Sequence, residues 1–333
     1  MAHRVSIVTG GAGFIAATLV PRLLSEGRTV VAADDLSRGR REHLDLAGAE
    51  GSDRIVFAEL DVSRRDRCDA LFERASALGA VDEVWHLAAN SDIPAGGADP
   101  DIDLKDTFLT TFEVLRAMRA HRVPALHFAS SSAVYGDHGD AVLHETTGPT
   151  LPISNYGAMK LASEAQAAAA GEAFLRTVNL FRFPNVVGVP ATHGVLLDFV
   201  RKLKLDRHRL EVLGDGTQQK AYLHVTDLVD AMFFVRNRES AERTRLVNVG
   251  PADDGVRVSW IAEQVVARVS PTARIVYGEG GRGWVGDVPR FRYSIETLRS
   301  LGWTPSLDSA TAVRRAIAEI ADQEGVPPGA MTP

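Results

Sequence analysis

Tyr156 and Lys160 are the residues whose types and spacing most directly suggest chemistry. They lie four residues apart in a stretch of helical character, so both side chains belong to one face of a helix. A lysine ammonium close to a phenol stabilises the phenolate, which lowers the pKa of the tyrosine from about 10 towards neutrality. Such a tyrosine can act as a general base that takes the proton of a hydroxyl group. An incidental Tyr–Lys pair would show the same pattern.

A run of three serines, Ser130-Ser131-Ser132, ends a predicted strand upstream of this pair. A hydroxyl at that place can hydrogen-bond the same substrate oxygen that Tyr156 would deprotonate. Serine clusters also occur simply because they suit turns, so the run gains meaning only together with Tyr156 and Lys160.

A glycine-rich segment, Thr9-Gly10-Gly11-Ala12-Gly13-Phe14-Ile15-Ala16, follows a predicted strand and opens a predicted helix. Glycines there let the backbone turn tightly and approach a pyrophosphate, and the helix N-terminus offers N–H groups to it. Asp34 ends the second predicted strand, where a carboxylate can bind a ribose 2′-hydroxyl and repel a 2′-phosphate. The pattern predicts a dinucleotide site that prefers NAD to NADP.

Two further segments are predicted to border the same cofactor. Asp61 and Val62 follow the third strand, where the adenine would lie. The sequence HLAAN at 86–90 ends the fourth strand with small residues that would let a flat cofactor pass. Each segment taken alone is also compatible with ordinary packing.

The elements that must position these residues alternate between strands and helices. We predict strands at 5–9, 29–34, 55–61, 81–87, 125–130 and 177–183, and helices at 14–26, 64–78, 103–121 and 156–171. Continuous apolar strands that alternate with helices predict a parallel sheet covered on both faces. The expected fold is a Rossmann-like, doubly wound α/β domain followed by a smaller α+β lobe with helices at 196–205, 225–237, 259–269 and 309–322.

Composition excludes several other classes of protein. The chain has 333 residues, 45% of them hydrophobic and 24% charged, with a formal net charge of −6, which argues against a dedicated nucleic-acid binder. We find neither an apolar run near the roughly 20 residues needed to cross a bilayer nor a secretory signal at the first residues. Cys68 is the single cysteine, which excludes an intrachain disulfide and any multi-cysteine metal site. We expect a cytoplasmic protein without a metal ion.

Together these motifs resemble the extended short-chain dehydrogenase/reductases. TGGAGFI, Asp34, HLAA, SSSAVYG, YGAMK and RFPNVVG occur in the order and spacing of that family. More narrowly the chain resembles its NAD-dependent nucleotide-sugar 4-epimerases, and it is most similar to the UDP-glucuronate 4-epimerase branch. The similarity continues through GDGTQQKAYLHVTDL and RGWVGDVP to LGW near residue 303.

The resemblance implies roles for individual residues. The implied catalytic residues are Ser131, Tyr156 and Lys160. The implied NAD contacts are Gly10, Gly13, Phe14, Ile15, Asp34, Asp35, Leu36, Ser37, Arg38, Asp61, Val62, Leu87, Ala88, Ala89, Thr107, Ser130, Tyr156, Lys160 and Phe183. The implied substrate contacts are Ser131, Ser132, Tyr156, Asn185, Thr192, His193, Gly194, Val195, Leu213, Lys220, Tyr222 and Arg282. The family further implies a homodimer through helices 103–121 and 156–171.

The chain departs from the family pattern at several of these places. Ala16 replaces the third glycine of the cofactor motif, and Thr107 stands where relatives often carry an asparagine. Lys220 stands where an arginine usually meets the diphosphate, and it keeps the charge but loses bidentate geometry. Arg282 is therefore our choice for the main diphosphate contact; the alternative is a solvated loop arginine.

The resemblance also bears on the reaction. Relatives begin by removing the proton from the sugar O4 while NAD takes a hydride from C4. The 4,6-dehydratases carry an Asp-Glu pair directly after the catalytic hydroxyl residue, and the uronate decarboxylases usually carry a glutamate one position further on. Here the two positions are Ser132 and Ala133. We therefore expect 4-epimerisation, most readily of UDP-glucuronate to UDP-galacturonate.

Other interpretations stay open at this point. The substrate could be UDP-glucose or UDP-N-acetylglucosamine, and Pro184 is apolar where a uronate carboxylate would favour a polar residue. A sugar-nucleotide dehydratase or oxidoreductase, or a non-catalytic NAD-binding regulator on the same fold, remain alternatives. We predict an NAD-binding domain formed by 1–183 and 220–250, and a nucleotide-sugar-binding lobe formed by 184–219 and 251–330.

Overall fold

The structure is a computed structural model that describes residues 4–46, 52–281, 288 and 290–327. Its contacts divide the chain into two compact units. The first unit comprises Met1–Gly136, Pro149–Arg182 and Met232–Val247, and the second comprises Asp137–Gly148, Phe183–Ala231 and Asn248–Pro333. Residues 137–148 and 220–231 thus fall in the second unit by contacts. The functional domains predicted above stay a prediction.

The first unit is built on a seven-stranded sheet with the order β12-β7-β5-β4-β1-β2-β3. The strands are β1 (Arg4–Thr9), β2 (Thr29–Asp34), β3 (Ile55–Glu59), β4 (Ala80–His86), β5 (Ala125–Ala129), β7 (Thr177–Arg182) and β12 (Thr244–Asn248). Each neighbouring pair from β3 to β7 runs parallel. Every residue of β2 is buried, as expected of a central parallel strand. The predicted Rossmann-like fold is confirmed.

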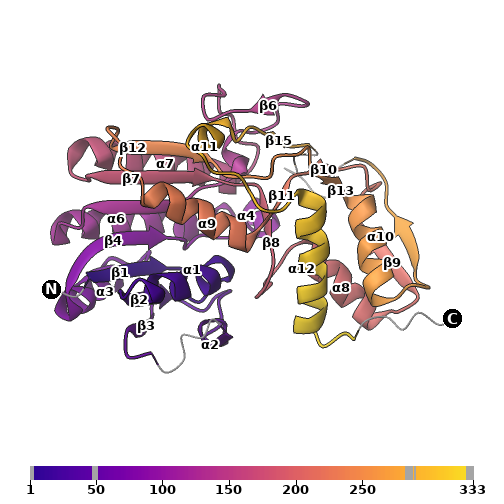
Figure 1. The fold of residues 1–333 in the computed structure, drawn as a ribbon, viewed down its shortest axis with the longest axis horizontal. Coiled ribbons are helices and arrows are strands. Elements are labelled where there is room, and N and C mark those ends of the chain that lie inside the picture. The colour runs from indigo at the N-terminus through magenta and orange to yellow at the C-terminus, as the bar shows by residue number, and fades with distance from the viewer. Residues whose placement is uncertain (1–3, 47–51, 282–287, 289, 328–333) are drawn as a thin grey trace. The chain divides into compact units, whose positions relative to one another are not determined.

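Helices cover the sheet on both faces. They are α1 (Phe14–Ser25), α2 (Glu42–Leu46), α3 (Arg65–Leu78), α4 (Ile93–Ala98), α5 (Pro100–Asp103), α6 (Thr110–His121), α7 (Asn155–Ala173) and α9 (Val225–Arg236). Helices α3, α6 and α7 pack side by side in one layer, and α1 lies in front of the strands in Figure 1. The apolar core between sheet and helices includes Phe72, Met118 and Phe128.

The predicted helix at 103–121 is not one regular helix. Between α5 and α6 the chain forms a π-helical segment, η1 (Leu104–Leu109). The hydroxyl of Thr110 donates to the carbonyls of Asp106 and Thr107, and that of Thr111 donates to Thr107. Such side-chain bonds compete with the backbone ladder of an α-helix. Single π-turns inside helices are frequent at functional sites.

The second unit has an apolar core around α8 (Val195–Leu205), α10 (Val258–Val269) and α12 (Ser309–Gln323). Its strands form four two-stranded sheets that pair β8 (Asn185–Val187) with β11 (Tyr222–His224), β9 (Arg209–Val212) with β14 (Arg274–Tyr277), β10 (Gln219–Lys220) with β13 (Val256–Arg257), and β6 (Val142–Leu143) with β15 (Arg292–Tyr293). The short helix α11 (Glu296–Ser300) and the 3-10 turn η2 (Ser132–Val134), the latter in the first unit, complete the elements. The α+β character of this lobe is as predicted.

Candidate active site

The turn between β1 and α1 has the geometry of a phosphate-binding loop. Gly10 adopts φ +66°, and a Cβ at this position would lie 2.8 Å from the backbone nitrogen of Ala88. Gly13 is the N-cap of α1 and makes no side-chain cap hydrogen bond, so the first N–H groups of the helix have no capping side chain. Only glycine fits at Gly10, and the helix N-terminus suits the pyrophosphate of a dinucleotide.

Asp34, at the end of β2, is held rigidly beside this turn. Its Oδ2 accepts the N–H of Ala12 at 3.0 Å, and its Oδ1 accepts the N–H of Leu36 at 2.8 Å. Burial raises the pKa of Asp34, and these two N–H groups oppose that shift. Each carboxylate oxygen has a second lone pair that can accept a ribose hydroxyl.

We expect cofactor-stripped protein to regain turnover with NAD and to regain little with NADP. A 2′-phosphate would bring negative charge next to the buried Asp34. The ratio of turnover after reconstitution of the stripped sample with NAD or with NADP measures the preference. The substitution Asp34→Asn should reduce this ratio. Equal rescue of the wild type by both cofactors would contradict the role of Asp34.

The three predicted catalytic residues come together at the ends of β5 and α7. The Tyr156 hydroxyl is hydrogen-bonded to the side chain of Ser131. The Lys160 Nζ lies 5.8 Å from the centre of the Tyr156 ring and donates to the carbonyl of Ala129 at 2.6 Å. The single helical turn between Tyr156 and Lys160 therefore places both side chains at the end of β5, Tyr156 against Ser131 and Lys160 against Ala129.

The predicted effect of Lys160 on Tyr156 is wrong for the protein by itself. Burial raises the pKa of Tyr156 to about 12, against the opposing hydrogen bond from Ser131. Burial likewise lowers the pKa of Lys160 to about 7, so near neutral pH its ammonium is only partly charged. Desolvation of the phenolate therefore outweighs the hydrogen bond from Ser131. A further positive charge next to the phenol, such as an oxidised nicotinamide, would lower the pKa of Tyr156.

Close packing at Gly157 sets the position of Tyr156. A Cβ at Gly157 would lie 2.5 Å from the carbonyl oxygen of Ala133, in the turn that carries the serines. The Gly157 N–H also donates the capping hydrogen bond of α7 to the Oγ of Ser154, 3.1 Å away. Helix α7 can thus approach the serine turn only because this position has no side chain.

A buried ion pair that the sequence analysis missed supports the same helix. Glu164 lies one turn beyond Lys160, and its carboxylate accepts two hydrogen bonds from Arg182, at 2.9 and 2.6 Å. The hydroxyl of Ser130 donates to the same carboxylate at 2.5 Å. The Ser130 side chain therefore faces Glu164, and its predicted contact with the cofactor stays a prediction. The i,i+4 spacing from Lys160 was the available sequence signal for Glu164.

Other predicted cofactor contacts lie in the first unit, in the segments that follow β1, β2, β3 and β4. Asp61 is bound by Ser63 and by the ammonium of Lys105 at 3.0 Å. The buried hydroxyl of Thr107 accepts the N–H of Asn90 at 3.2 Å. Arg38 forms an ion pair with Asp92 at 2.5 Å. Val62, which is buried, is another member, and the remaining members are Phe14, Ile15, Asp35, Leu36, Ser37, Leu87, Ala88 and Ala89.

Most predicted substrate contacts lie in the second unit. Thr192 and His193 are hydrogen-bonded to each other at 2.9 Å, just before Gly194, the N-cap of α8. Asn185 and Tyr222 are partners in the β8–β11 pair, and Leu213 is exposed. Val195 begins α8, Lys220 ends β10, and the predicted cofactor contact Phe183 also falls in this unit. Arg282 lies outside the described residues.

Within residues 4–46, 52–281, 288 and 290–327, no three His, Cys, Asp or Glu side chains gather as a metal site would require. The described helices include none long and apolar enough to cross a membrane.

Comparison with known proteins identifies relatives along nearly the whole chain. Residues 6–250 match the model of the NAD dependent epimerase/dehydratase family. The UDP-glucose 4-epimerase of Mycolicibacterium smegmatis is 31% identical over 94% of this chain and 97% of its own. A crystal structure of UDP-galactose 4-epimerase has a TM-score of 0.81 and 34% identity, covering 96% of this chain and 99% of that one.

A third relative was solved with ligands. MoeE5 in complex with UDP-glucuronic acid and NAD has a TM-score of 0.77 and 26% identity, covering 96% of this chain and 99% of that one. Its cofactor agrees with the glycine turn and with Asp34 described above. The chain belongs to the NAD dependent epimerase/dehydratase family, and it is an epimerase with NAD as its cofactor.

Proposed function

We propose that the protein epimerises a UDP-sugar at C4 through a 4-keto intermediate, and that its principal substrate is UDP-glucuronate, converted to UDP-galacturonate. The observation that carries the proposal is the composition of the turn beside Tyr156. Ser131 reaches the phenol, while the next two positions are Ser132 and Ala133. A hydroxyl and a methyl group offer no carboxylate acid or base for dehydration or decarboxylation.

The chain's residues would divide the work as follows. Ser131 and Tyr156 bind the sugar O4, and Tyr156 takes its proton in one direction and returns it in the other. The serine hydroxyl holds the phenol in place, and the Lys160 ammonium lies 5.8 Å from the centre of the tyrosine ring. The glycine turn and Asp34 would hold NAD, which would supply a hydride acceptor and donor for C4. Rotation of the keto sugar between the two transfers inverts C4, and the cofactor is regenerated in each cycle.

The uronate preference rests on two considerations. MoeE5, solved with UDP-glucuronic acid, is similar to this chain along nearly its whole length. The neutral donors Ser132 and Thr192 are candidate partners for the C6 carboxylate. A hydrogen bond to a charged group is worth about 1.5–3 kcal/mol, so two of them could set a preference. UDP-glucose and UDP-N-acetylglucosamine are the alternative substrates. Most relatives are named UDP-glucose 4-epimerases, which favours UDP-glucose of these two.

We expect the enzyme to convert UDP-glucuronate to UDP-galacturonate with little loss of carbon dioxide. The 4-keto intermediate of a uronate is a β-keto acid that loses its carboxylate readily unless the carboxylate is held out of alignment. Incubation with UDP-glucuronate, UDP-glucose and UDP-N-acetylglucosamine, without added cofactor, with products identified by NMR, measures the preference. Ser132→Ala should reduce uronate turnover more than glucose turnover.

Each alternative has a distinct result in this experiment. Efficient epimerisation of UDP-glucose with no reaction of UDP-glucuronate would remove the uronate proposal and keep the epimerase. A UDP-pentose as main product would contradict the inference from Ala133. Net formation of NADH would instead indicate an oxidoreductase.

We also propose a homodimer. Leu104, Leu109 and Phe112 are 43%, 37% and 41% exposed, and they lie close together along η1 and α6. Large apolar side chains grouped on a surface favour contact with a partner. Light scattering of the purified protein should give about twice the mass of one chain, and a monomer at micromolar concentration would contradict this assembly.

A further inference from the structure

Asp103 is a buried carboxylate with one oxygen that has no hydrogen-bond partner among the described residues. It is not one of the predicted site residues. Its side chain is inaccessible to solvent. The Oδ1 accepts a hydrogen bond from the side-chain amide of Asn90 at 2.9 Å. The Oδ2 has no hydrogen-bond partner in the described part of the chain. A buried carboxylate with an open oxygen is costly, so its retention calls for an explanation.

The fold makes room for this carboxylate at one particular glycine. A Cβ at Gly96 in α4 would lie 1.8 Å from the Asp103 Oδ2, so no larger residue fits there. The carbonyl of the same Gly96 accepts a bond from the side chain of Asn155 at 2.8 Å. Asn155 directly precedes Tyr156, and α4, α5 and η1 all pack against α7. The Asp103 pocket and the catalytic helix are therefore held together.

Lys160 is the cation that the charges around Asp103 indicate as its electrostatic partner. Helix α5, which ends at Asp103, packs against α7, the helix of Tyr156 and Lys160, and Asp103 acts electrostatically on both residues. Burial raises the pKa of Asp103 itself, and the hydrogen bond from Asn90 and the charge of Lys160 oppose that shift. Among the described residues no lysine or arginine forms a salt bridge with it.

The neighbouring ionisable groups are otherwise engaged. Glu164, the other carboxylate near Lys160, is bound by Arg182. Asp106, next to Asp103 along the chain, is bound to Lys105 at 3.2 Å. Burial and Lys160 lower the pKa of His86 to about 3, which keeps it neutral. Lys160 is thus the positive charge left to balance Asp103.

We propose that Asp103 is a positioning residue of the epimerase: its carboxylate favours the protonated form of Lys160 beside Tyr156. The proposal rests on the proposed function only in giving Tyr156 and Lys160 the chemical roles. Asp103 touches neither substrate nor cofactor in this scheme, and it acts through the lysine.

The direction of its effect follows from the sign of the charge. A negative group raises the pKa of a nearby lysine, and Asp103 does so for Lys160, together with Glu164 and against the larger effect of burial. With Asp103 neutral, the pKa of Lys160 would fall below about 7, and the ammonium would be lost at a lower pH. An opposite charge at close range typically shifts a pKa by about one unit or more.

Direct titration of Lys160 tests the proposal. The chain has only five lysines, so the full-length protein labelled with [13C]lysine gives few Cε signals, and Lys160→Met assigns the relevant one. We expect Asp103→Asn to move the titration of Lys160 to lower pH by about one unit. Asp106→Asn is the matched control, because it removes an adjacent carboxylate that already has its own lysine. The pH profile of turnover should shift in the same direction for Asp103→Asn alone.

The outcomes separate this proposal from the proposed function. A folded Asp103→Asn protein with the wild-type titration of Lys160 would overturn the proposal. Asp103→Ser removes the same charge with a smaller side chain and serves if the asparagine variant does not fold. If the titration shifts as expected while no UDP-sugar is turned over, the charge coupling stands and the proposed reaction is wrong.

Discussion

Replacing Tyr156 with phenylalanine is expected to reduce turnover of a UDP-sugar by about 10²-fold or more, the usual size of a lost general base. The substitution removes the hydroxyl that is bonded to Ser131 and keeps the ring next to Lys160. Cofactor binding and the melting temperature should stay near those of the wild type, because the rest of the NAD site is untouched. Turnover by rapid mixing and bound NAD by absorbance measure the two effects.

Two further variants help to interpret the turnover of Tyr156→Phe. Tyr277→Phe changes a partly exposed tyrosine in the second unit and is the matched control. Lys160→Met should lower turnover and also weaken NAD binding, since the resemblance assigns its ammonium to the cofactor as well. Near-normal turnover by Tyr156→Phe would mean that another group takes the proton.

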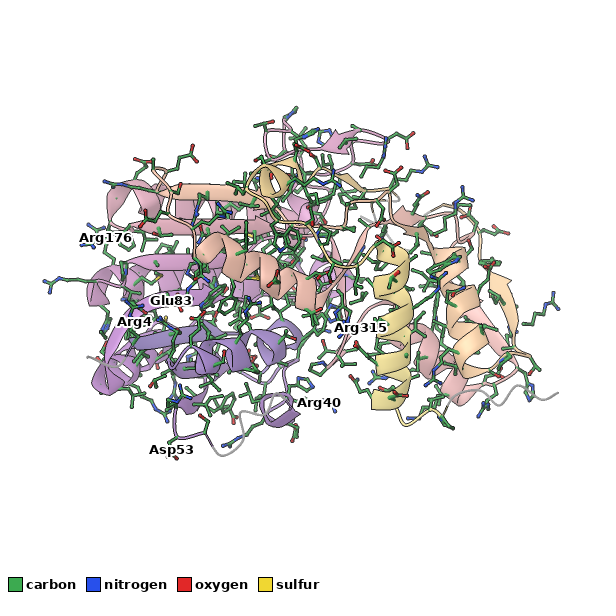
Figure 2. All side chains as sticks on the ribbon, viewed as in Figure 1. Arg4, Arg40, Asp53, Glu83, Arg176 and Arg315 are labelled. Atoms are coloured by element: carbon green, nitrogen blue, oxygen red, sulfur yellow. The ribbon has the colours of Figure 1, made fainter. Side chains whose placement is uncertain are left out.

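Replacing Glu83 with glutamine is expected to cost about 3–5 kcal/mol of unfolding free energy, the range for a broken buried ion pair. Glu83 is 4% exposed and accepts from Ser6, from the Trp85 indole and from Arg236. Arg28 Nε lies 3.1 Å from the same carboxylate. Loss of the negative charge would leave the guanidinium groups of Arg28 and Arg236 with one carboxylate partner each, Asp82 and Glu26. Figure 2 labels Glu83 among the strands of the first unit.

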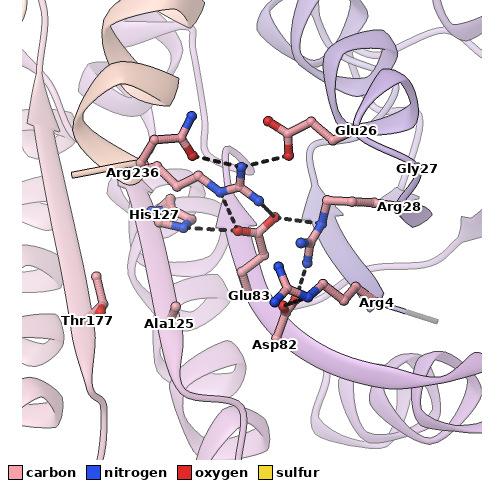
Figure 3. A pocket seen from close by; sticks show the side chains of 11 residues that line it. Arg4, Glu26, Gly27, Arg28, Asp82, Glu83, Ala125, His127, Thr177 and Arg236 are labelled. Carbon is pink, nitrogen blue, oxygen red and sulfur yellow. Dashed lines mark hydrogen bonds and ion pairs between the residues drawn. The ribbon is translucent and has the colours of Figure 1, made fainter. Parts of the chain in front are cut away.

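Glu83 lines a pocket of about 800 Å³ at the amino ends of β1, β4, β5 and β7. Figure 3 shows the ion pairs there, which join Glu83 to Arg28 and Arg236, and Arg236 to Glu26. The cations and carboxylates that line it are paired with one another, which favours a structural role over ligand binding.

His127 extends this network across the sheet. The side-chain oxygen of Asn179 accepts from Arg245 at 2.8 Å, so its amide nitrogen faces His127 Nδ1 at 2.9 Å. His127 Nδ1 must therefore accept, and the ring proton is on Nε2, 3.4 Å from Glu83. Burial lowers the pKa of His127, in keeping with a neutral ring.

Acid should weaken the contribution of Glu83. The partners of Glu83 hold its pKa well below the ordinary value. Its stabilisation is therefore complete above the unfolded pKa of about 4.3 and is lost as pH falls towards the folded pKa. Urea unfolding of the wild type and of Glu83→Gln between pH 7 and pH 3 measures the difference, which should shrink on acidification. Asp66→Asn, at an exposed ion pair, is the control and should cost less than about 1 kcal/mol.

The sequence by itself determined the local features. Alternating apolar strands and helices predicted the Rossmann-like sheet, because side-chain period and buried strands follow directly from residue order. The glycine turn, Asp34 and the Tyr156–Lys160 face were predicted for the same reason, since each depends on residues within a few positions or on one strand end. The π-helical segment at 104–109 could not be predicted from the sequence. The threonine hydroxyls that compete with the backbone hydrogen bonds of the helix act according to its tertiary packing.

Only the tertiary structure decided the charge states of the site. The pKa of Tyr156 is raised rather than lowered, because burial outweighs the hydrogen bond from Ser131. Arg182 meets Glu164, Asn90 meets Asp103, and Arg236 meets Glu83 across 18, 13 and 153 residues of chain. Desolvation and counter-charges depend on neighbours brought together by folding, and residue spacing contains no measure of either.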